Sequence, residues 1–165
     1  MKKIKCLTIA LILSLTCVAC GGGGGGGHDY SGTWNVQGSL VRNGCPTNPQ
    51  KGENYNIIVN QDGDDIVVFD GQNTYTGSTN GIDEYIENGF AVEHTFPNGT
   101  QNHIYITNIR GDVGDFTEHF YIPVSLSTVS GLGSCEITYS GRAQRVSKNT
   151  KELSTSPYKK FKTNF

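Results

Sequence analysis

The sequence predicts an all-β domain, an antiparallel up-and-down meander that closes into a small barrel. Two observations lead to this prediction. The stretch from residue 30 to residue 146 has no convincing helical period and is rich in Gly, Asn, Thr and Tyr. Turn signals also recur in it about every ten residues, and short strands at that spacing are typical of β-sandwiches and β-barrels.

Nine segments are expected to form strands, because apolar residues alternate or cluster in each of them between turn residues. They are Thr33–Arg42, Asn54–Gln61, Asp65–Asp70, Thr74–Ser78, Ile82–Glu87, Phe90–Phe96, Gln101–Arg110, Phe116–Thr128 and Cys135–Arg145.

Two turns allow the pairing of strands to be predicted. Pro97-Asn98-Gly99 suits a three-residue hairpin loop, since Pro presets the first position and Gly accepts the left-handed third. Phe96 then faces Thr100, and Glu93 lies opposite His103. The same argument applied to Gln61-Asp62-Gly63 predicts which residues share the inner face of the next hairpin: Tyr55, Ile57, Val67 and Phe69.

Cys45 and Cys135 are expected to form a disulfide, since they are an even pair in a chain that carries a secretory signal. The bond would make the first and last strands antiparallel neighbours, with residue numbers that sum to about 179. Consecutive hairpins whose first strand meets their last form a closed barrel without exposed edges. The pairs expected from this register are Trp34 with Arg145, Val36 with Ala143, Gly38 with Gly141 and Leu40 with Tyr139.

The amino terminus has the pattern of a secretory signal. Met1–Lys5 carries three lysines, and Leu7–Ala19 is almost wholly apolar or small, which is too short for the ~20 residues of a membrane-spanning helix. Cys17-Val18-Ala19-Cys20 resembles the lipobox of bacterial lipoproteins, although that family usually has Leu where this chain has Cys17. The resemblance implies that residues 1–19 are removed and that Cys20 is lipidated, with Cys17 as the alternative site.

Residues 20–29 then form the lipidated cysteine and a tether. Seven consecutive glycines lose too much conformational entropy to fold, and Gly21–Gly27 would reach about 15 Å as a flexible chain. Residues 30–146 form the barrel domain. Residues 147–165 are a basic tail that we expect to be disordered, or alternatively to contact anionic lipid or the acidic barrel.

The charge distribution argues against nucleic acid as a partner. The whole chain has a formal net charge of −2, which becomes about −5 once the three signal-segment lysines are removed. Residues 28–145 contain 14 acidic and five basic side chains. Nucleic-acid binding instead depends on a basic surface that neutralises phosphates.

Gly32-Thr33-Trp34 opens the first predicted strand and resembles the Gly-x-Trp signature of lipocalins. The resemblance implies that Trp34 lies across the closed end of a barrel and that an Arg of the last strand packs on it, Arg145 first and Arg142 second. The layout matches over about 115 residues. The family's middle Thr-Asp-Tyr motif and its accompanying helix have no counterpart here. Avidin also begins Gly-x-Trp, but its several biotin-site tryptophans are missing.

No catalytic pattern appears, so the protein is expected not to be an enzyme and to need no cofactor. The histidines His28, His94, His103 and His119 are expected not to converge, which argues against a zinc site. Asp62, Asp64 and Asp65 lack the spacing of a calcium loop. The sequence therefore predicts no metal site.

Two functions remain open. The first is a lipid-anchored carrier that holds one small apolar ligand inside the barrel. The second is a filled barrel that contacts a protein or glycan partner. Both would act in the cell envelope, with the outer membrane favoured because Gly21 stands where an inner-membrane retention signal would place Asp. The residues predicted to line a ligand cavity are Tyr55, Tyr75, Phe90, His94, Phe96 and Phe120.

Overall fold

The computed structural model describes residues 28–82, 85–125 and 132–149. The signal segment, Cys20, Gly21–Gly27 and most of the basic tail lie outside these ranges. The described residues contain eight β-strands: β1 (Gly32–Asn43), β2 (Gly52–Asp62), β3 (Asp65–Phe69), β4 (Thr74–Ser78), β5 (Phe90–Thr95), β6 (Gln101–Arg110), β7 (Val113–Ser125) and β8 (Leu132–Ser147). Within them, no helix is long and apolar enough to cross a membrane.

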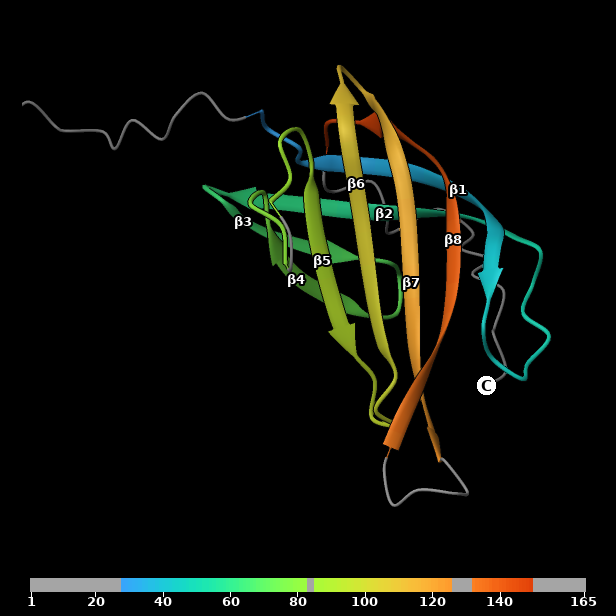
Figure 1. Cartoon of the computed structure of the whole chain (residues 1–165). Helices are drawn as coiled ribbons and strands as arrows, with labels where there is room; N and C mark the ends of the chain where they lie inside the picture. Colours follow the sequence, from blue (N-terminus) through green and yellow to red (C-terminus); the bar gives the residue numbers. More distant parts are fainter. Residues whose placement is uncertain (1–27, 83–84, 126–131, 150–165) are drawn as a thin grey trace, which may run out of the picture.

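The predicted fold class is confirmed, because the eight strands form one closed barrel in sequence order. Each strand is antiparallel to the next, and β1 pairs with both β2 and β8. In Figure 1, β5 to β8 run nearly upright while β1 and β2 cross behind them at a steep angle. Such strong twist is what lets few strands close into a barrel.

The expected strand at Ile82–Glu87 is wrong. Residue 82 and residues 85–87 are not in a strand, because β4 pairs directly with β5 through Thr76 with Glu93 and Gly77 with Val92. The described residues between these two strands, 79–82 and 85–89, are outside any strand. The predicted segment at residues 116–128 corresponds to β7, which begins earlier, at Val113; its last three predicted residues lie outside the described ranges.

The predicted closure of the barrel is confirmed residue by residue. Trp34 pairs with Arg145, Val36 with Ala143, Gly38 with Gly141 and Leu40 with Tyr139. The register shifts by one residue on either side of this stretch, at Val146 and at Val41. Both of these extra residues are exposed, so the strands bulge outward there without disturbing the inner face.

The predicted register of β5 and β6 is also confirmed. Glu93 pairs with His103, and the amide N–H of Phe96 donates to the carbonyl of Thr100 at 2.8 Å. Gly99 has a φ of 83°, the left-handed conformation for which glycine was expected at this position.

The predicted register of β2 and β3 is wrong. Val59 pairs with Val68, and Asp62 pairs with Asp65 across a two-residue loop instead of a three-residue one. Relative to the predicted pairing, β3 is shifted along β2 by an odd number of residues, and an odd shift moves every side chain of the strand to the other face. Val67 and Phe69, expected inside, are therefore 40% and 37% exposed, while the β3 residues that point inward are Ile66 and Val68.

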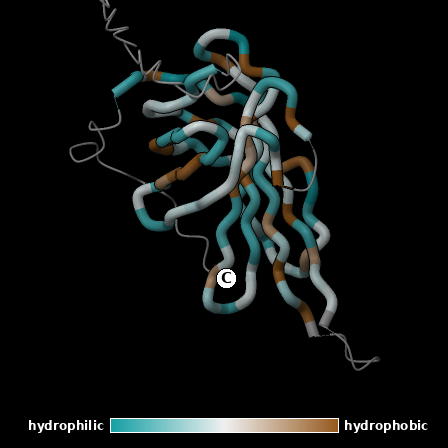
Figure 2. Tube along the Cα trace, turned by 90° about the vertical axis from the view of Figure 1, so that its left-hand side faces the viewer, coloured by the Kyte–Doolittle hydropathy of each residue, from teal (hydrophilic) through white to brown (hydrophobic). Residues whose placement is uncertain are grey.

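The interior contains two apolar clusters. Figure 2 shows hydrophobic and hydrophilic residues alternating along the strands, the pattern of a sheet that buries one face. The larger cluster includes Trp34, Phe90 and Phe116. The smaller one joins Phe120, Ile137 and Tyr139 to Cys45. It lies toward the far end of the long strands β7 and β8.

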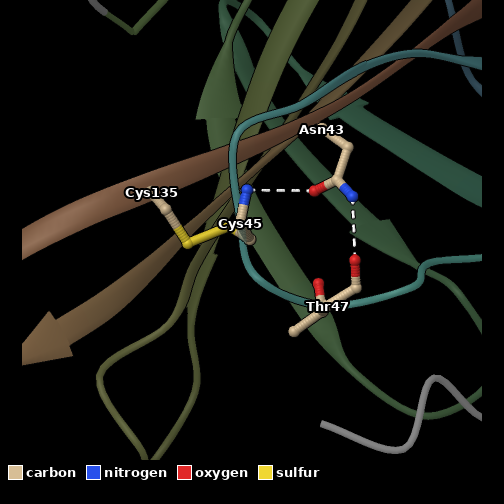
Figure 3. Close-up of a disulfide and its surroundings, with 4 residues drawn as sticks. All are labelled: Asn43, Cys45, Thr47 and Cys135. Atoms are coloured by element: carbon tan, nitrogen blue, oxygen red, sulfur yellow. Dashed lines mark hydrogen bonds between the residues drawn. A yellow bond between two sulfur atoms is a disulfide. The ribbon is translucent and has the colours of Figure 1, made fainter.

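The predicted disulfide between Cys45 and Cys135 is present (Figure 3). It joins the loop after β1 to the start of β8, 90 residues along the chain. Asn43 shapes this loop, since its Oδ1 accepts the amide N–H of Cys45 at 3.0 Å and its Nδ2 donates to the carbonyl of Thr47 at 2.9 Å. The bond thus links the two strands that close the barrel.

Removing the disulfide should lower the free energy of unfolding. Replacing both Cys45 and Cys135 by Ser should cost about 2–5 kcal/mol, because the cross-link restricts the unfolded chain over a loop of some 90 residues. Urea titration of the variant and of the oxidised and reduced wild type measures this. The reduced wild type should match the variant. Equal midpoints for the oxidised protein and the variant would contradict the prediction.

Candidate functional site

One end of the barrel is sealed around Trp34, which is completely buried. Its Nε1 donates to the carbonyl of Tyr30 at 2.8 Å. The guanidinium carbon of Arg145 lies 5.4 Å from the centroid of the Trp34 rings, a favourable position for a cation over an aromatic face. The Nε of Arg145 also donates to Asp112 at 2.7 Å. These contacts join the N-terminal segment of the domain to its last strand across this end of the barrel.

Gly32 allows this close approach. Its φ is 135°, and a Cβ atom there would lie 2.2 Å from the carbonyl oxygen of Ser147. Only glycine combines that backbone conformation with that contact. The Gly-x-Trp pair therefore has a local physical reason, apart from any resemblance to a family.

The six predicted cavity residues lie in four different places. Phe90 belongs to the sealed end, with its ring 6.5 Å from that of Trp34. Phe120 packs in the smaller cluster, 6.3 Å from Tyr139. His94 and Phe96 are half-buried at the end of β5, where His94 Nδ1 lies 2.9 Å from the carbonyl oxygen of Thr74. Tyr55 and Tyr75 lie between these regions.

Tyr55 and Tyr75 belong to a hydrogen-bonded set that we call the interior polar group: Tyr55, Tyr75, Asn102 and Glu118. Tyr55 donates its hydroxyl proton to Glu118 Oε2 at 2.7 Å. Asn102 Nδ2 donates to Glu118 Oε1 at 2.6 Å and to the Tyr75 hydroxyl at 3.2 Å. Glu118, Asn102 and Tyr75 are completely buried, and Tyr55 is 6% exposed.

The interior polar group is anchored to the barrel wall through Asp70. Tyr75 donates its hydroxyl proton to Asp70 Oδ2 at 2.9 Å. Asp70 Oδ1 accepts the backbone N–H groups of Gln72 and Asn73 at 2.8 and 2.7 Å. The turn between β3 and β4 thereby fixes one end of the group, and the backbone of β7 fixes the other through Glu118.

The tyrosines of this region resist ionisation. Burial first, and then the charge of Glu118, raise the pKa of Tyr55 well above its ordinary value. The same causes, together with Asp70, raise the pKa of Tyr75. Burial and the carboxylates of Glu53 and Glu118 raise the pKa of Tyr139 to about 12. The phenol groups therefore remain hydrogen-bond donors throughout the physiological range.

Sequence reasoning missed Glu118, Asn102 and Asp70. The sequence does contain a signal for the first two. Glu118 stands between Phe116 and Phe120 at the inward period of β7, and Asn102 stands two residues before Ile104. A polar residue that interrupts an inward apolar series is informative, because burying it costs free energy unless it finds a partner. No comparable pattern marks Asp70, which lies in a turn.

The described residues cover the end of the barrel opposite Trp34 less fully. Leu40 and Ile122, which pack against the smaller apolar cluster, and His94 and Phe96 are only half-buried, in contrast to the fully buried Trp34 and Phe90. Two polar atoms near this end are buried without a hydrogen-bond partner, Asn102 Oδ1 and Thr100 Oγ1. The interior polar group therefore lies between a sealed apolar end and a more open one.

Two histidines meet on the outer face, contrary to the expectation that none converge. His103 of β6 is the direct cross-strand partner of His119 of β7, since the turn between these strands sets a register that the sequence did not reveal. His103 Nε2 lies 3.4 Å from Glu93 Oε2, and His119 Nδ1 lies 2.8 Å from Glu136 Oε1. Each histidine is thus beside its own carboxylate.

Next to this pair the outer face is hollowed. A depression of about 410 Å³ is lined by Gly99, Gln101, His103, Tyr121, Pro123, Gly133 and Ser134. The His103 and Tyr121 rings meet edge to face, with centroids 5.1 Å apart. Aromatic rings beside amide and hydroxyl groups form a surface that is both apolar and able to form hydrogen bonds.

Among the described residues, no group of three or more His, Cys, Asp or Glu side chains could hold a metal ion. Comparison with known proteins adds no family: no protein-family model, curated protein or solved structure matches this chain.

Tyr139 should make the protein less stable at alkaline pH. An unfolded tyrosine ionises near pH ~10, whereas the folded pKa is raised to about 12. The contribution of Tyr139 to the free energy of unfolding is thus fully present below pH ~10 and is lost as the pH rises toward 12, because only the unfolded chain releases the proton there. In urea titrations from pH 9 to 11.5, the free energy of unfolding should fall less for Tyr139→Phe than for wild type. Tyr85→Phe, at a position 77% exposed, is the control and should decline like wild type.

Proposed function

We propose that this protein is a lipid-anchored binding protein of the cell envelope, whose barrel holds one small, largely apolar ligand. The observation that carries the proposal is the contrast between the two ends of the barrel. Trp34 and Arg145 seal one end, whereas half-buried apolar side chains such as Leu40, Phe96 and Ile122 surround the other. A barrel that is closed at one end and less fully covered by the described residues at the other suits the entry of a small molecule.

The place of action follows from the amino terminus. The signal segment, the lipobox-like Cys17-Val18-Ala19-Cys20 and the poly-Gly tether support anchoring of Cys20 in the outer membrane. The disulfide between Cys45 and Cys135 supports an oxidising compartment. The lipocalin resemblance of Gly32 and Trp34 supports the same kind of function, because lipocalins carry small molecules.

We further propose that the protein is not an enzyme. His94, which was expected to line the cavity, contacts the rings of Tyr75 and Phe96 and the carbonyl of Thr74. In the described part of the chain it forms no ion pair with a carboxylate. A general acid–base pair at that position would need such a partner.

The outer hollow supports a second candidate function. If the interior accepts no ligand, the surface formed by His103, Tyr121, Pro123 and their neighbours would contact a partner, and a glycan fits it better than a flat protein surface. Sugar rings stack on aromatic side chains, while Gln101 and Ser134 offer hydrogen bonds to hydroxyl groups.

Cys20 should determine where the protein resides. Cys20→Ser removes the thiol that would carry the lipid. The protein should then leave the membrane fraction for the soluble fraction, or should keep its signal segment uncleaved. Cys17→Ser is the matched control and should leave the protein in the membrane. Fractionation after metabolic labelling with a fatty acid measures both. Label on the Cys20→Ser variant would place the lipid elsewhere, at Cys17.

Native mass spectrometry should detect the ligand. The mature chain with Cys20→Ser, purified from the periplasm, should carry a small additional mass that denaturing extraction releases. Trp34 provides a control, because Trp34→Ala should open the sealed end and lower the retained mass fraction severalfold. A bare protein mass in repeated preparations would contradict the carrier and favour the outer-surface function.

A further inference from the structure

Glu118 is a carboxylate in the interior that has no cation beside it. It is completely buried, and its two oxygens accept hydrogen bonds from Tyr55 and Asn102. None of the ion pairs among the described residues includes it. Burying an ionised carboxylate is costly unless a positive charge compensates it. Two neutral donors satisfy its hydrogen bonds but do not balance its charge.

The arginines of β1 and β8 lie away from Glu118, and Arg142 of β8 is exposed. Arg42 pairs with Glu136 on the outer face at 2.6 Å, and Arg145 is held at the sealed end by Asp112. Neither reaches the interior polar group.

One oxygen atom beside Glu118 has no hydrogen-bond partner: Oδ1 of Asn102, whose Nδ2 already donates to Glu118. Oγ1 of Thr100, two residues earlier and just before the start of β6, is also buried without a partner. Unpartnered buried acceptors call for a donor.

Aromatic rings adjoin this acceptor-rich region on the side of the open end. Phe120 is the cross-strand neighbour of Asn102, and Tyr139 is the neighbour of Glu118. Their rings meet edge to face, 6.3 Å apart. Aromatic faces attract cations and also pack against apolar groups.

We propose that the ligand is an amine with an apolar body, and that its ammonium group pairs with Glu118. An ammonium brings a positive charge and three donors, which matches the carboxylate and the unpartnered Oδ1 of Asn102 beside it. The apolar body extends past Phe120 toward the open end. This inference rests on the proposed function and adds the chemical class of its ligand.

A metal ion fits these residues less well than an ammonium. No described group of His, Cys, Asp or Glu has the number required, and the two donors on Glu118 occupy positions that a metal would take. An anionic ligand would be repelled by Glu118. A neutral ligand would leave its charge uncompensated.

A set of three matched probes tests the proposal. 2-Phenylethylamine, 2-phenylethanol and phenylacetate have similar apolar bodies and carry a positive, a zero and a negative charge. Isothermal titration of the ligand-stripped mature chain should give an affinity for the amine about ten- to a hundredfold above that for the alcohol, the usual range for a charge-assisted contact. Phenylacetate should bind weakest.

Glu118→Gln keeps the shape of the side chain and removes its charge. It should reduce the affinity for 2-phenylethylamine at least tenfold and leave that for 2-phenylethanol unchanged. Glu87→Gln, on an exposed residue of the β4–β5 connection, should change neither. If Glu118→Gln does not fold, as judged by circular dichroism, Asn102→Ala, which removes the unpartnered Oδ1, replaces it and should weaken the amine selectively by a smaller factor.

Different outcomes distinguish failure of the ammonium site from failure of the proposed ligand-carrying function. Equal binding of the amine and the alcohol, or an amine affinity that Glu118→Gln leaves intact, overturns the ammonium site but not the small-ligand barrel. Binding of none of the three probes, together with a bare mass in native mass spectrometry, overturns both.

Discussion

The pairing of β1 with β8 is the constraint on which the rest of this structure depends. It converts a meander with two open edges into a barrel with none, and it joins residues about a hundred positions apart. The same pairing sets Arg145 over Trp34 at one end. The disulfide between Cys45 and Cys135 holds the other end of the same two strands. Without this pairing neither a sealed end nor an enclosed interior would exist.

Because the barrel is closed, each side chain that points inward is removed from water, and a polar one costs free energy unless it finds a partner. Phe116, Glu118 and Phe120 succeed one another on one face of β7, so Glu118 is forced into an apolar interior by the period of its own strand. Tyr55 from β2 and Asn102 from β6 compensate it in part with hydrogen bonds. This completely buried carboxyl group, held by two neutral donors, distinguishes the barrel from one filled by apolar residues alone.

Local chemistry explains which parts of the fold could be predicted. Pro97-Asn98-Gly99 determined the register of β5 and β6, and the cysteine pair determined that of β1 and β8. Asp62-Gly63 was ambiguous, because loops of two and three residues both accept Gly there, and the wrong choice turned Val67 and Phe69 inward. The pairing of His103 with His119 was missed because no turn residue before β7 was read for its register. In the candidate site, Tyr55 and Tyr75 were predicted inside, but Glu118, Asn102 and Asp70 were not.

By itself the sequence determined what depends on neighbours along the chain: the period of two that divides each strand into an inner and an outer face, the turn between β5 and β6, and the cysteine pair that implies closure. Its amino-terminal pattern also predicts secretion and a lipid anchor. Only the tertiary structure decided which inward side chains meet. Tyr55, Asn102 and Glu118 come from three strands, and their hydrogen bonds span 63 and 16 residues of sequence. Such contacts depend on the registers of several strand pairs at once, and an odd error in any one of them exchanges inside and outside.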